Sequence, residues 1–315
     1  MSIILLIFGL LLLIKAASIF VDGCSNVAKA LKIPSIIVGL TIVALGTSTP
    51  EAVVSINASL KQMNDMALGN VIGSSICNLL LVLGCSGLAG TIIAKKKVMT
   101  RDYKFMMFSS MILFVMIFSF YITGQTSGVI TRTSGFLLLG FLFLYFYILM
   151  VDAINNAHHK EDDDKDHKVK IKDIIYIILG LAGVVISGDL VVDNAVEIAN
   201  WLNISERVIG LTIIAIGTSL PELVTSVIAS KKNEDDIAIG NVVGSNILNV
   251  LFMLGASSVI SPIEFEISAF IDVVVMMFAT ILVYMILKKD RKIEKKDSIV
   301  LLLFYIIYMI FILMR

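Results

Sequence analysis

Long apolar stretches separated by short polar segments recur along the whole chain. Each stretch has about 20 residues with few or no charges, the length that an α-helix needs to cross the hydrocarbon core of a bilayer. The pattern predicts an all-α membrane protein with ten transmembrane helices. The predicted spans are residues 2–21, 36–59, 66–90, 105–123, 128–150, 173–196, 207–230, 237–261, 267–287 and 298–314.

The composition indicates that lipid is the main solvent of this chain. Of its 315 residues, 58% are hydrophobic and only 16% are charged. A soluble domain is about half apolar and a quarter charged. We therefore predict a multi-pass protein of the cell membrane, with the lipid bilayer as its surroundings and no nucleic-acid partner.

The basic residues fall mainly in alternate loops. One set of loops carries 20 of the 25 Lys and Arg residues, the opposite set carries four, and Lys15 lies within the first span. The positive-inside rule then predicts that both termini lie outside the cell. It also places residues 151–172, a central segment rich in acidic and basic residues, in the cytoplasm as a solvated linker.

The residues that commonly serve enzymes are poorly placed for catalysis. Cys24, Cys77 and Cys85 have no Cys-x-x-Cys spacing, and we interpret them as buried apolar side chains without a disulfide. All three histidines lie in the central linker, so the membrane core contains no imidazole. Because the sequence offers neither a catalytic nucleophile nor a catalytic metal centre, we expect no enzymatic activity and no cofactor.

The chain contains an internal repeat. A shift of 171 residues aligns Gly39–Gly84 with Gly210–Gly255 without a gap, and more than half of the positions are identical. Chance similarity between apolar segments would match Leu and Val, but here polar residues match as well. The polar pairs include Thr47 with Thr218, Glu51 with Glu222, and Asn78 with Asn249.

The repeat divides the chain into residues 1–150 and residues 173–315, with five predicted spans in each half. Because five is odd, the second half enters the membrane from the opposite side, and the repeats are inverted. Inverted repeats are typical of secondary transporters, whose substrate site lies at mid-membrane between the halves.

Each half carries a proline in the middle of its second span. Pro50 follows Gly46, and Pro221 follows Gly217 at the same spacing. Proline lacks an amide donor and clashes with the preceding turn, so it frees main-chain carbonyls nearby. Free carbonyls are tolerated at membrane depth only where they line a cavity or contact a ligand. The motifs thus predict ligand-binding breaks in two helices.

Glu51 and Glu222 directly follow the two prolines. A carboxylate at mid-membrane is costly unless it is paired, and such residues usually mark an ion pathway. The neighbouring core segments contain no Lys or Arg, so a cation from outside is the natural partner. Carboxylates, carbonyls and hydroxyls form an all-oxygen set, which suits Ca²⁺ and Na⁺.

The third span of each half adds further polar residues. Ser74 and Asn78 lie four residues apart and therefore share one helix face, as do Ser245 and Asn249. Packing explains the glycines of these spans but not the repeated Ser and Asn, which we assign to the ion site.

The motif Gly-Thr-Ser-x-Pro-Glu, followed by Gly-Asn-x-x-Gly-Ser-x-Ile-x-Asn, occurs in both halves. The two copies closely resemble the alpha repeats of sodium/calcium exchangers in the cation/calcium antiporter superfamily. The resemblance covers essentially the whole chain and is strongest to prokaryotic members, which have a short cytoplasmic linker.

The resemblance implies a set of ion ligands. Glu51 and Glu222 would bind Ca²⁺ together with main-chain oxygens of Thr47 and Thr218, and Asn78 would contribute its amide. Asn249 stands where the family often has an aspartate, which leaves potassium dependence and stoichiometry open. The residues implied for flanking Na⁺ sites are Ala44, Ala215, Ser48, Ser219, Ser74 and Ser245.

These observations predict a secondary active antiporter that exchanges Na⁺ for Ca²⁺ by alternating access and functions as a monomer. We expect an electrogenic cycle of three Na⁺ per Ca²⁺. The alternative within the same superfamily is an H⁺/Ca²⁺ exchanger. A cation channel is a more distant alternative, because channels usually assemble their filters from several subunits, whereas this chain supplies both halves of a site.

Overall fold

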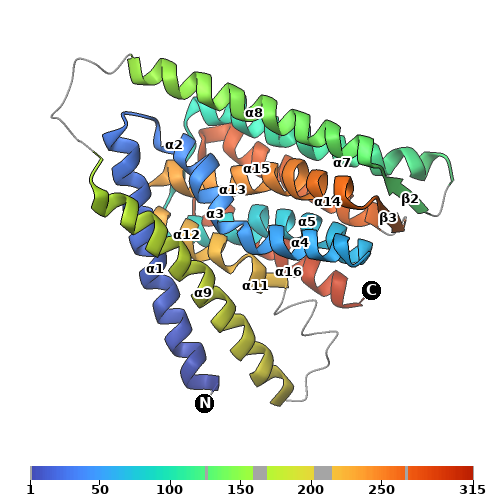
Figure 1. Ribbon diagram of the computed structural model, residues 1–315, viewed down its shortest axis with the longest axis horizontal. Coiled ribbons are helices and arrows are strands. Elements are labelled where there is room, and N and C mark those ends of the chain that lie inside the picture. Colours follow the sequence, from blue (N-terminus) through green and yellow to red (C-terminus); the bar gives the residue numbers. More distant parts are fainter. Residues whose placement is uncertain (1, 125–126, 159–168, 202–214, 267–268, 315) are drawn as a thin grey trace.

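The computed structural model describes residues 2–124, 127–158, 169–201, 215–266 and 269–314, and it is mostly helical (Figure 1). The first half contains α1 (Ser2–Ala30), α2 (Ser35–Val38), η1 (Gly39–Val43), α3 (Ala44–Thr47), α4 (Thr49–Leu60), α5 (Asn64–Cys77), η2 (Asn78–Val82), α6 (Leu83–Ala89), β1 (Ile92–Ile93), η3 (Val98–Asp102), α7 (Tyr103–Ile122), β2 (Ser127–Ile130) and α8 (Arg132–His158), where η marks a π-helical turn. The second half contains α9 (Ile171–Trp201), α11 (Ala215–Thr218), α12 (Leu220–Lys231), α13 (Asp235–Leu248), η5 (Asn249–Leu254), α14 (Gly255–Ile260), β3 (Ile263–Glu266), α15 (Ala269–Asp290), β4 (Lys292–Ile293) and α16 (Lys295–Met314).

The described residues contain nine helical segments that are long and apolar enough to cross a membrane. Eight are continuous, and the ninth is Ser35–Thr47 with Thr49–Leu60, bent by 51°. They match nine of the ten predicted spans. The remaining predicted span, 207–230, begins outside the described residues and ends as α11 and α12.

Several of the predicted spans were shorter than the observed helices. Helix α1 continues to Ala30, nine residues beyond the predicted end of the first span at 21. Helix α8 reaches His158, and α9 begins at Ile171, so both helices extend into the predicted linker 151–172. Residues 159–168 of that linker lie outside the described residues. Hydropathy marks the part of a helix that contacts hydrocarbon, not the polar turns that continue beyond it.

Two antiparallel strand pairs depart from the all-α prediction. Strand β1 pairs with β4, and β2 pairs with β3, so each pair joins one strand of the first half to one of the second. Figure 1 shows β2 and β3 together at one end of the molecule. The strands have only two to four residues, too few to give a hydropathy signal.

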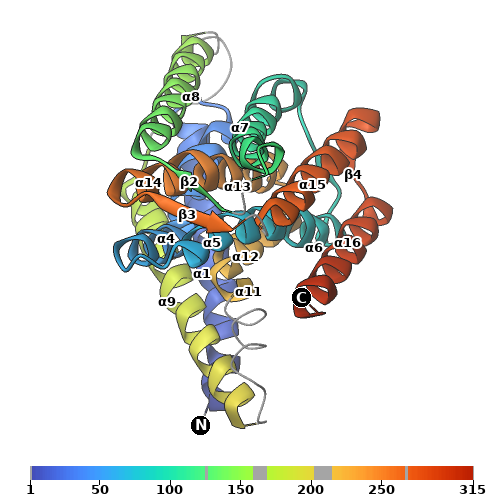
Figure 2. The same ribbon diagram turned by 90° about the vertical axis from the view of Figure 1, so that its right-hand side faces the viewer.

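Helices α1 and α9 form a pair that crosses the other helices at an angle (Figures 1 and 2). Small residues allow their close approach. A Cβ atom on Gly180 would lie 2.6 Å from the main-chain nitrogen of Phe20, and one on Gly183 would lie 2.8 Å from the Cβ atom of Ala16. Such small residues are typical of helix contacts within a membrane.

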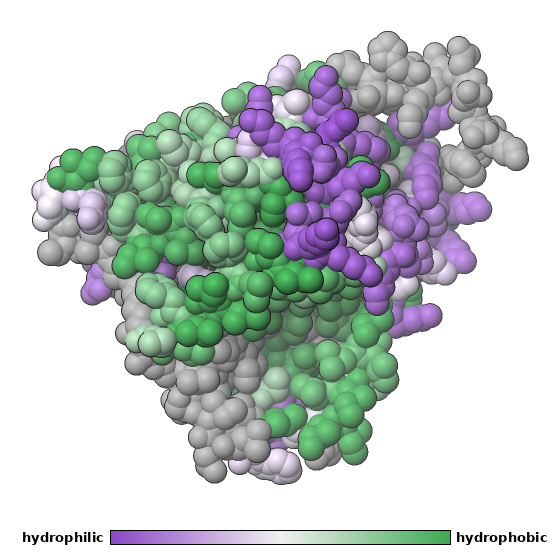
Figure 3. Space-filling view, turned by 180° about the vertical axis from the view of Figure 1, so that it is seen from behind, coloured by the Kyte–Doolittle hydropathy of each residue, from purple (hydrophilic) through white to green (hydrophobic). Residues whose placement is uncertain are grey.

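The spans built on α5 and α13 form the centre of the molecule. Their most apolar windows are 78% and 94% buried inside the protein, compared with 17–33% for the other six continuous spans. Outside this centre, apolar side chains cover much of the surface, and hydrophilic ones gather towards one end (Figure 3). Such a surface suits a protein surrounded by lipid, with its polar end in water.

We predict that the end of the molecule that carries Lys97 and Lys292, which we call the basic end, faces the cytoplasm. The β1–β4 pair and the hydrogen bond from Ala94 N to Arg291 O, 2.8 Å, bring the regions of Lys97 and Lys292 together at this end. Single cysteines placed at Lys97 or Lys292 in a background without native cysteines should react with an impermeant reagent only from the cytoplasmic side. A cysteine at Lys61 should react only from outside. Reaction of Lys97→Cys and Lys61→Cys from the same side would contradict this topology.

Candidate ion-binding site

A helix break precedes each glutamate of the repeated motif. Ser48 separates α3 from α4, and Ser219 separates α11 from α12, so that both serines lie outside the helices. Pro50 and Pro221 then occupy the first turn, where a missing amide donor costs least. Glu51 and Glu222 follow in the same turn of α4 and α12. The motif therefore turns one span of each half into two helices with a carboxylate at the junction.

The two glutamates lie close together and are linked through serines of opposite halves. Glu51 is 1% exposed and Glu222 is 0% exposed. Ser219 Oγ donates a hydrogen bond to Glu51 Oε1 at 3.1 Å, and Ser48 Oγ donates one to Glu222 Oε1 at 2.7 Å. Each carboxylate is thus held by the helix break of the other half.

Two asparagines, Asn78 and Asn249, occupy equivalent positions in the two halves. Asn78 begins η2 and Asn249 begins η5, both at a π-helical turn, a local widening that is frequent at functional sites. Both side chains are 1% exposed. Asn249 Nδ2 donates a hydrogen bond to Ser75 Oγ at 3.2 Å, which crosses from one half to the other.

Four oxygen atoms at this centre are buried without a hydrogen-bond donor. They are Glu51 Oε2, Glu222 Oε2, Asn78 Oδ1 and Asn249 Oδ1. They make up half of the eight such side-chain atoms found among the described residues. Buried acceptors are normally satisfied, so these unsatisfied oxygens on residues of the two repeated motifs are candidate ligands for a bound ion.

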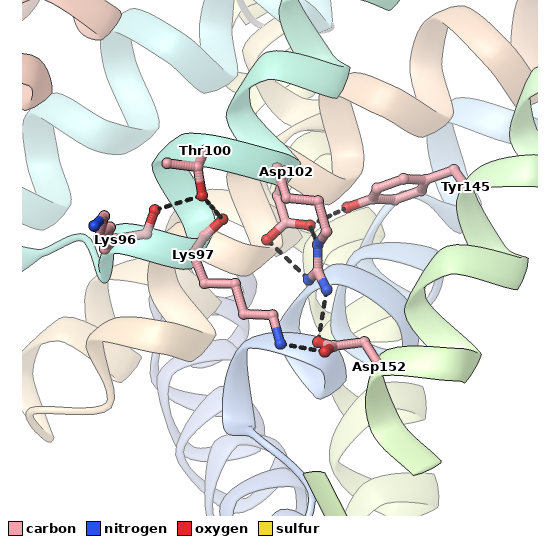
Figure 4. A network of polar contacts seen from close by, with 7 residues as sticks. Lys96, Lys97, Thr100, Asp102, Tyr145 and Asp152 are labelled. Carbon is pink, nitrogen blue, oxygen red and sulfur yellow. Dashed lines mark hydrogen bonds and ion pairs between the residues drawn. The ribbon is translucent and has the colours of Figure 1, made fainter. Parts of the chain in front are cut away.

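Other buried carboxylates of the described residues have protein partners. Arg101 donates two hydrogen bonds to Asp102, at 2.6 and 3.0 Å, and Tyr145 donates a third (Figure 4). Lys95 pairs with Asp236 at 2.5 Å. By contrast, none of the ion pairs between described residues involves Glu51 or Glu222. When ionised, these two side chains therefore have no counter-ion among the described residues.

The donor set is all oxygen. The described residues contain no group of three or more His, Cys, Asp or Glu side chains that would hold a metal ion. The side chains predicted to bind an ion carry oxygen ligands, on two carboxylates, amides and hydroxyls. Such ligands favour hard ions, which include Ca²⁺ and Na⁺.

Most of the remaining predicted site residues are buried. Ser245 is 0% exposed and its hydroxyl lies 2.8 Å from that of Ser48, whereas Ser74 is 4% exposed. Thr47 Oγ1 donates to Asn241 Oδ1 at 3.0 Å. Ala44 packs closely on α13, because a Cβ atom on Gly244 would lie 2.7 Å from that of Ala44.

Two predicted residues belong to the break of the second half. Thr218 is half-buried and lines a cavity next to the centre. Ala215 begins α11, and the surroundings of its side chain lie outside the described part of the chain.

Two asparagines that were not predicted as site residues, Asn70 and Asn241, hold the glutamates in place. Asn70 Nδ2 donates to the main-chain oxygen of Glu51 at 3.1 Å and to Ser55 Oγ at 2.8 Å. Asn241 Nδ2 donates to the main-chain oxygen of Glu222 at 3.4 Å and to Ser226 Oγ at 2.9 Å. Both asparagines and both serines match at the shift of 171 residues, and this match was the signal that could have identified them.

The fold defines a class: a multi-pass helical membrane protein, in which two buried glutamates from repeated motifs lie close together. The model of the family described as "Sodium/calcium exchanger protein" matches residues 1–151 and 172–314. The chain therefore belongs to the sodium/calcium exchanger family, which is a family of membrane antiporters and not of enzymes.

Individual relatives agree with this assignment. The chain is 38% identical to the putative antiporter CaxA of Alkalimonas amylolytica, covering 97% of this chain and 96% of the relative. It is 30% identical to the sodium/calcium exchanger MaX1 of Methanosarcina acetivorans, covering 98% and 97%. A solved structure of the sodium-calcium exchanger NCX_Mj, soaked without Na⁺ and Ca²⁺, superposes with a TM-score of 0.78 at 31% identity and covers 97% of each chain.

We predict that Glu51→Gln and Glu222→Gln each abolish calcium flux in proteoliposomes and leave a folded protein. Glutamine keeps the shape of the side chain and removes the charge that the bound cation requires. Glu266→Gln, at an exposed position of β3, is the matched control and should transport normally. Near-normal flux of either site variant, at equal reconstitution, would contradict the assignment of the centre.

Proposed function

We propose that this protein is a secondary active antiporter that exchanges Na⁺ for Ca²⁺ across the cell membrane by alternating access. The observation that carries the proposal is the group of four buried, unsatisfied oxygens on Glu51, Glu222, Asn78 and Asn249. Two carboxylates balance the charge of one Ca²⁺, and the relatives named as sodium/calcium exchangers match over nearly the whole chain.

The proposed ligands follow from the arrangement. Ca²⁺ would bind between Glu51 and Glu222, with main-chain oxygens of Thr47 and Thr218 and the amide of Asn78. Na⁺ would occupy the same centre and its flanks. The residues proposed to contact Na⁺ are Ala44, Ala215, Ser48, Ser219, Ser74, Ser245 and Asn249.

Reciprocal contacts support two inverted halves of five spans each. Ser48 contacts Glu222. The equivalent residue of the second half, Ser219, contacts Glu51 in the same way. Such exchange between equivalent residues is expected of a pseudo-twofold axis in the membrane plane. We propose ten helices in halves 1–150 and 173–315, joined by the cytoplasmic linker, with both termini outside. One chain then contains the complete site and functions as a monomer.

The donor set favours Na⁺ over H⁺ as the coupling ion. A protonated pair of glutamates would also be neutral, and an H⁺/Ca²⁺ exchanger would need little more than these two groups. Serine hydroxyls and asparagine amides do not ionise at physiological pH, so they would not carry a transported proton. They are, however, suitable ligands for a hard monovalent cation, and they surround both carboxylates.

The charge of the centre supports a cycle of three Na⁺ per Ca²⁺. One Ca²⁺ between two carboxylates leaves the centre neutral, and neutral centres cross the membrane with the smallest penalty. Three Na⁺ leave one positive charge, which the surrounding hydroxyl and amide oxygens would spread. Asn249 adds no further negative charge, so we propose that K⁺ is neither required nor carried.

Radioactive calcium uptake into proteoliposomes tests the coupling ion. We expect an outward sodium gradient to drive uptake and a pH gradient of equal size to leave it near background. Uptake that follows the pH gradient and ignores sodium would contradict Na⁺ coupling and favour the H⁺/Ca²⁺ exchanger.

The same vesicles test the stoichiometry when their voltage is clamped with potassium and valinomycin. One net charge moved through 100 mV is worth about 2.3 kcal/mol, so a voltage that favours the net movement of charge should speed sodium-driven uptake. A rate that is unchanged by voltage of either sign would indicate an electroneutral exchange of two Na⁺ per Ca²⁺.

A further inference from the structure

The side-chain amide of Asn249 is held at one end and free at the other. Its Nδ2 atom donates a hydrogen bond to Ser75 Oγ at 3.2 Å. Its Oδ1 atom is buried and accepts none of the hydrogen bonds between described residues. A ligand oxygen of an ion site has to be free in this way, because a hydrogen-bond donor would compete with the ion. The contact that holds the amide therefore decides whether Asn249 presents an oxygen or an NH₂ group.

Asn249 lies on the helix face that borders the glutamates. Ser245 precedes it by four residues, so the two side chains share one face at the junction of α13 and η5. The hydroxyl of Ser245 lies 2.8 Å from that of Ser48, which donates to Glu222 Oε1 at 2.7 Å. A free oxygen on this face is thus on the side of the proposed ion site.

The hydroxyl of Ser75 permits only one orientation of the Asn249 amide. Ser75 Oγ lies 2.7 Å from the main-chain oxygen of Val71, which can only accept, so the single hydroxyl proton is used there. Ser75 Oγ then has only acceptor capacity left, and the NH₂ end of Asn249 satisfies it. If the amide were turned over, two acceptors would face each other without a proton between them. The chain of donors therefore runs from Asn249 to Ser75 and from Ser75 to Val71.

The internal repeat separates the two contacts of Ser75. Its equivalent at the shift of 171 residues is Asn246. Asn246 Nδ2 donates to the main-chain oxygen of Val242 at 2.8 Å, four residues earlier, as Ser75 Oγ does to Val71. A bond to the preceding turn is a local feature of polar residues within helices. The bond that Ser75 accepts from Asn249 is different, because it joins the two halves and sets the orientation of a side chain.

We propose that Ser75 is a positioning residue for Na⁺ binding, which turns the amide of Asn249 so that Oδ1 faces the ion and Nδ2 faces away. The inference rests on the proposed exchange, in which Asn249 contacts Na⁺ and Ca²⁺ is bound by other residues. An amide oxygen is a suitable ligand for a hard cation, whereas an NH₂ group would direct the positive end of its dipole at the ion. Ser75 acts through Asn249, so loss of its hydroxyl should weaken the binding of Na⁺ more than that of Ca²⁺.

Displacement of calcium by sodium from the purified protein measures this effect. Binding of radioactive calcium is recorded in choline and then at rising Na⁺, with calcium held at the dissociation constant of each variant. Ser75→Ala removes the acceptor of one neutral hydrogen bond, which should weaken the Na⁺ at Asn249 about fivefold, or about 1 kcal/mol. If three Na⁺ bind together, the sodium concentration at half displacement should rise by the cube root of this factor, about 1.7-fold. Calcium affinity in choline should stay within about twofold of the parent value.

Ser109→Ala is the matched control. Ser109 is 0% exposed in α7, and its hydroxyl donates to the main-chain oxygen of Met106 at 2.8 Å. Among the described residues it accepts no hydrogen bond from an amide side chain, so both constants should equal those of the parent. Ser75→Thr retains the hydroxyl and should also keep the parent values. Ser75→Cys replaces Ser75→Ala if the latter cannot be purified, and the weak acceptor capacity of its thiol should shift the midpoint in the same direction.

A double-mutant cycle tests whether Ser75 acts through Asn249. Asn249→Ala removes the amide that Ser75 orients, so the addition of Ser75→Ala should cause no further rise in the sodium midpoint. A further rise as large as that caused by Ser75→Ala alone would show that the two residues act independently, which would overturn the positioning role.

The same measurement separates this inference from the proposed function. If sodium displaces calcium from the parent protein, an unchanged midpoint in Ser75→Ala, or an equal loss of calcium and sodium affinity, would overturn the positioning role alone. Failure of sodium to displace calcium from the parent protein would contradict the proposed exchange, and the role of Ser75 with it.

Discussion

Two glutamates with no ion-pair partner among the described residues lie at the centre of this molecule, and hydrogen bonds from the surrounding structure hold them there. Glu51 and Glu222 are almost fully buried, and each receives a hydrogen bond from a serine of the opposite half. Buried charges of this kind are strongly unfavourable unless they are paired. Elsewhere in the described residues, buried Asp102 and Asp236 have basic partners. A bound cation, the cargo proposed above, would supply the counter-charge that the described neighbours do not.

This requirement accounts for several features that would otherwise weaken a membrane protein. The helix breaks at Ser48 and Ser219 bring each serine hydroxyl within hydrogen-bond distance of the glutamate of the other half. The buried glycines of α13 allow the opposite half to approach, and the strand pairs tie the two halves together away from the centre. Local irregularity is tolerated at membrane depth where it borders a ligand site, and here it is concentrated around Glu51 and Glu222.

The sequence predicted most of the spans and the central residues, because both depend on properties that individual residues carry. Hydropathy detects a stretch of apolar residues of sufficient length, and the repeat singled out the buried polar pairs such as Glu51 with Glu222. The extension of α1 to Ala30, the β1–β4 and β2–β3 pairs and the π-helical turn at Asn78 were not predicted. They depend on contacts between distant segments or on the hydrogen-bond register within a helix, which neither hydropathy nor the repeat specifies.

Competition between the two ions at equilibrium tests the central claim most directly. Binding of radioactive calcium to the purified protein is measured while Na⁺ is raised at constant ionic strength, with choline as the replaced cation. If one centre between Glu51 and Glu222 holds either Ca²⁺ or Na⁺, sodium should displace all of the bound calcium, with a steep dependence on sodium concentration. Calcium that stays bound at saturating sodium, or that binds unchanged in Glu51→Gln, would show that the two ions do not share this centre.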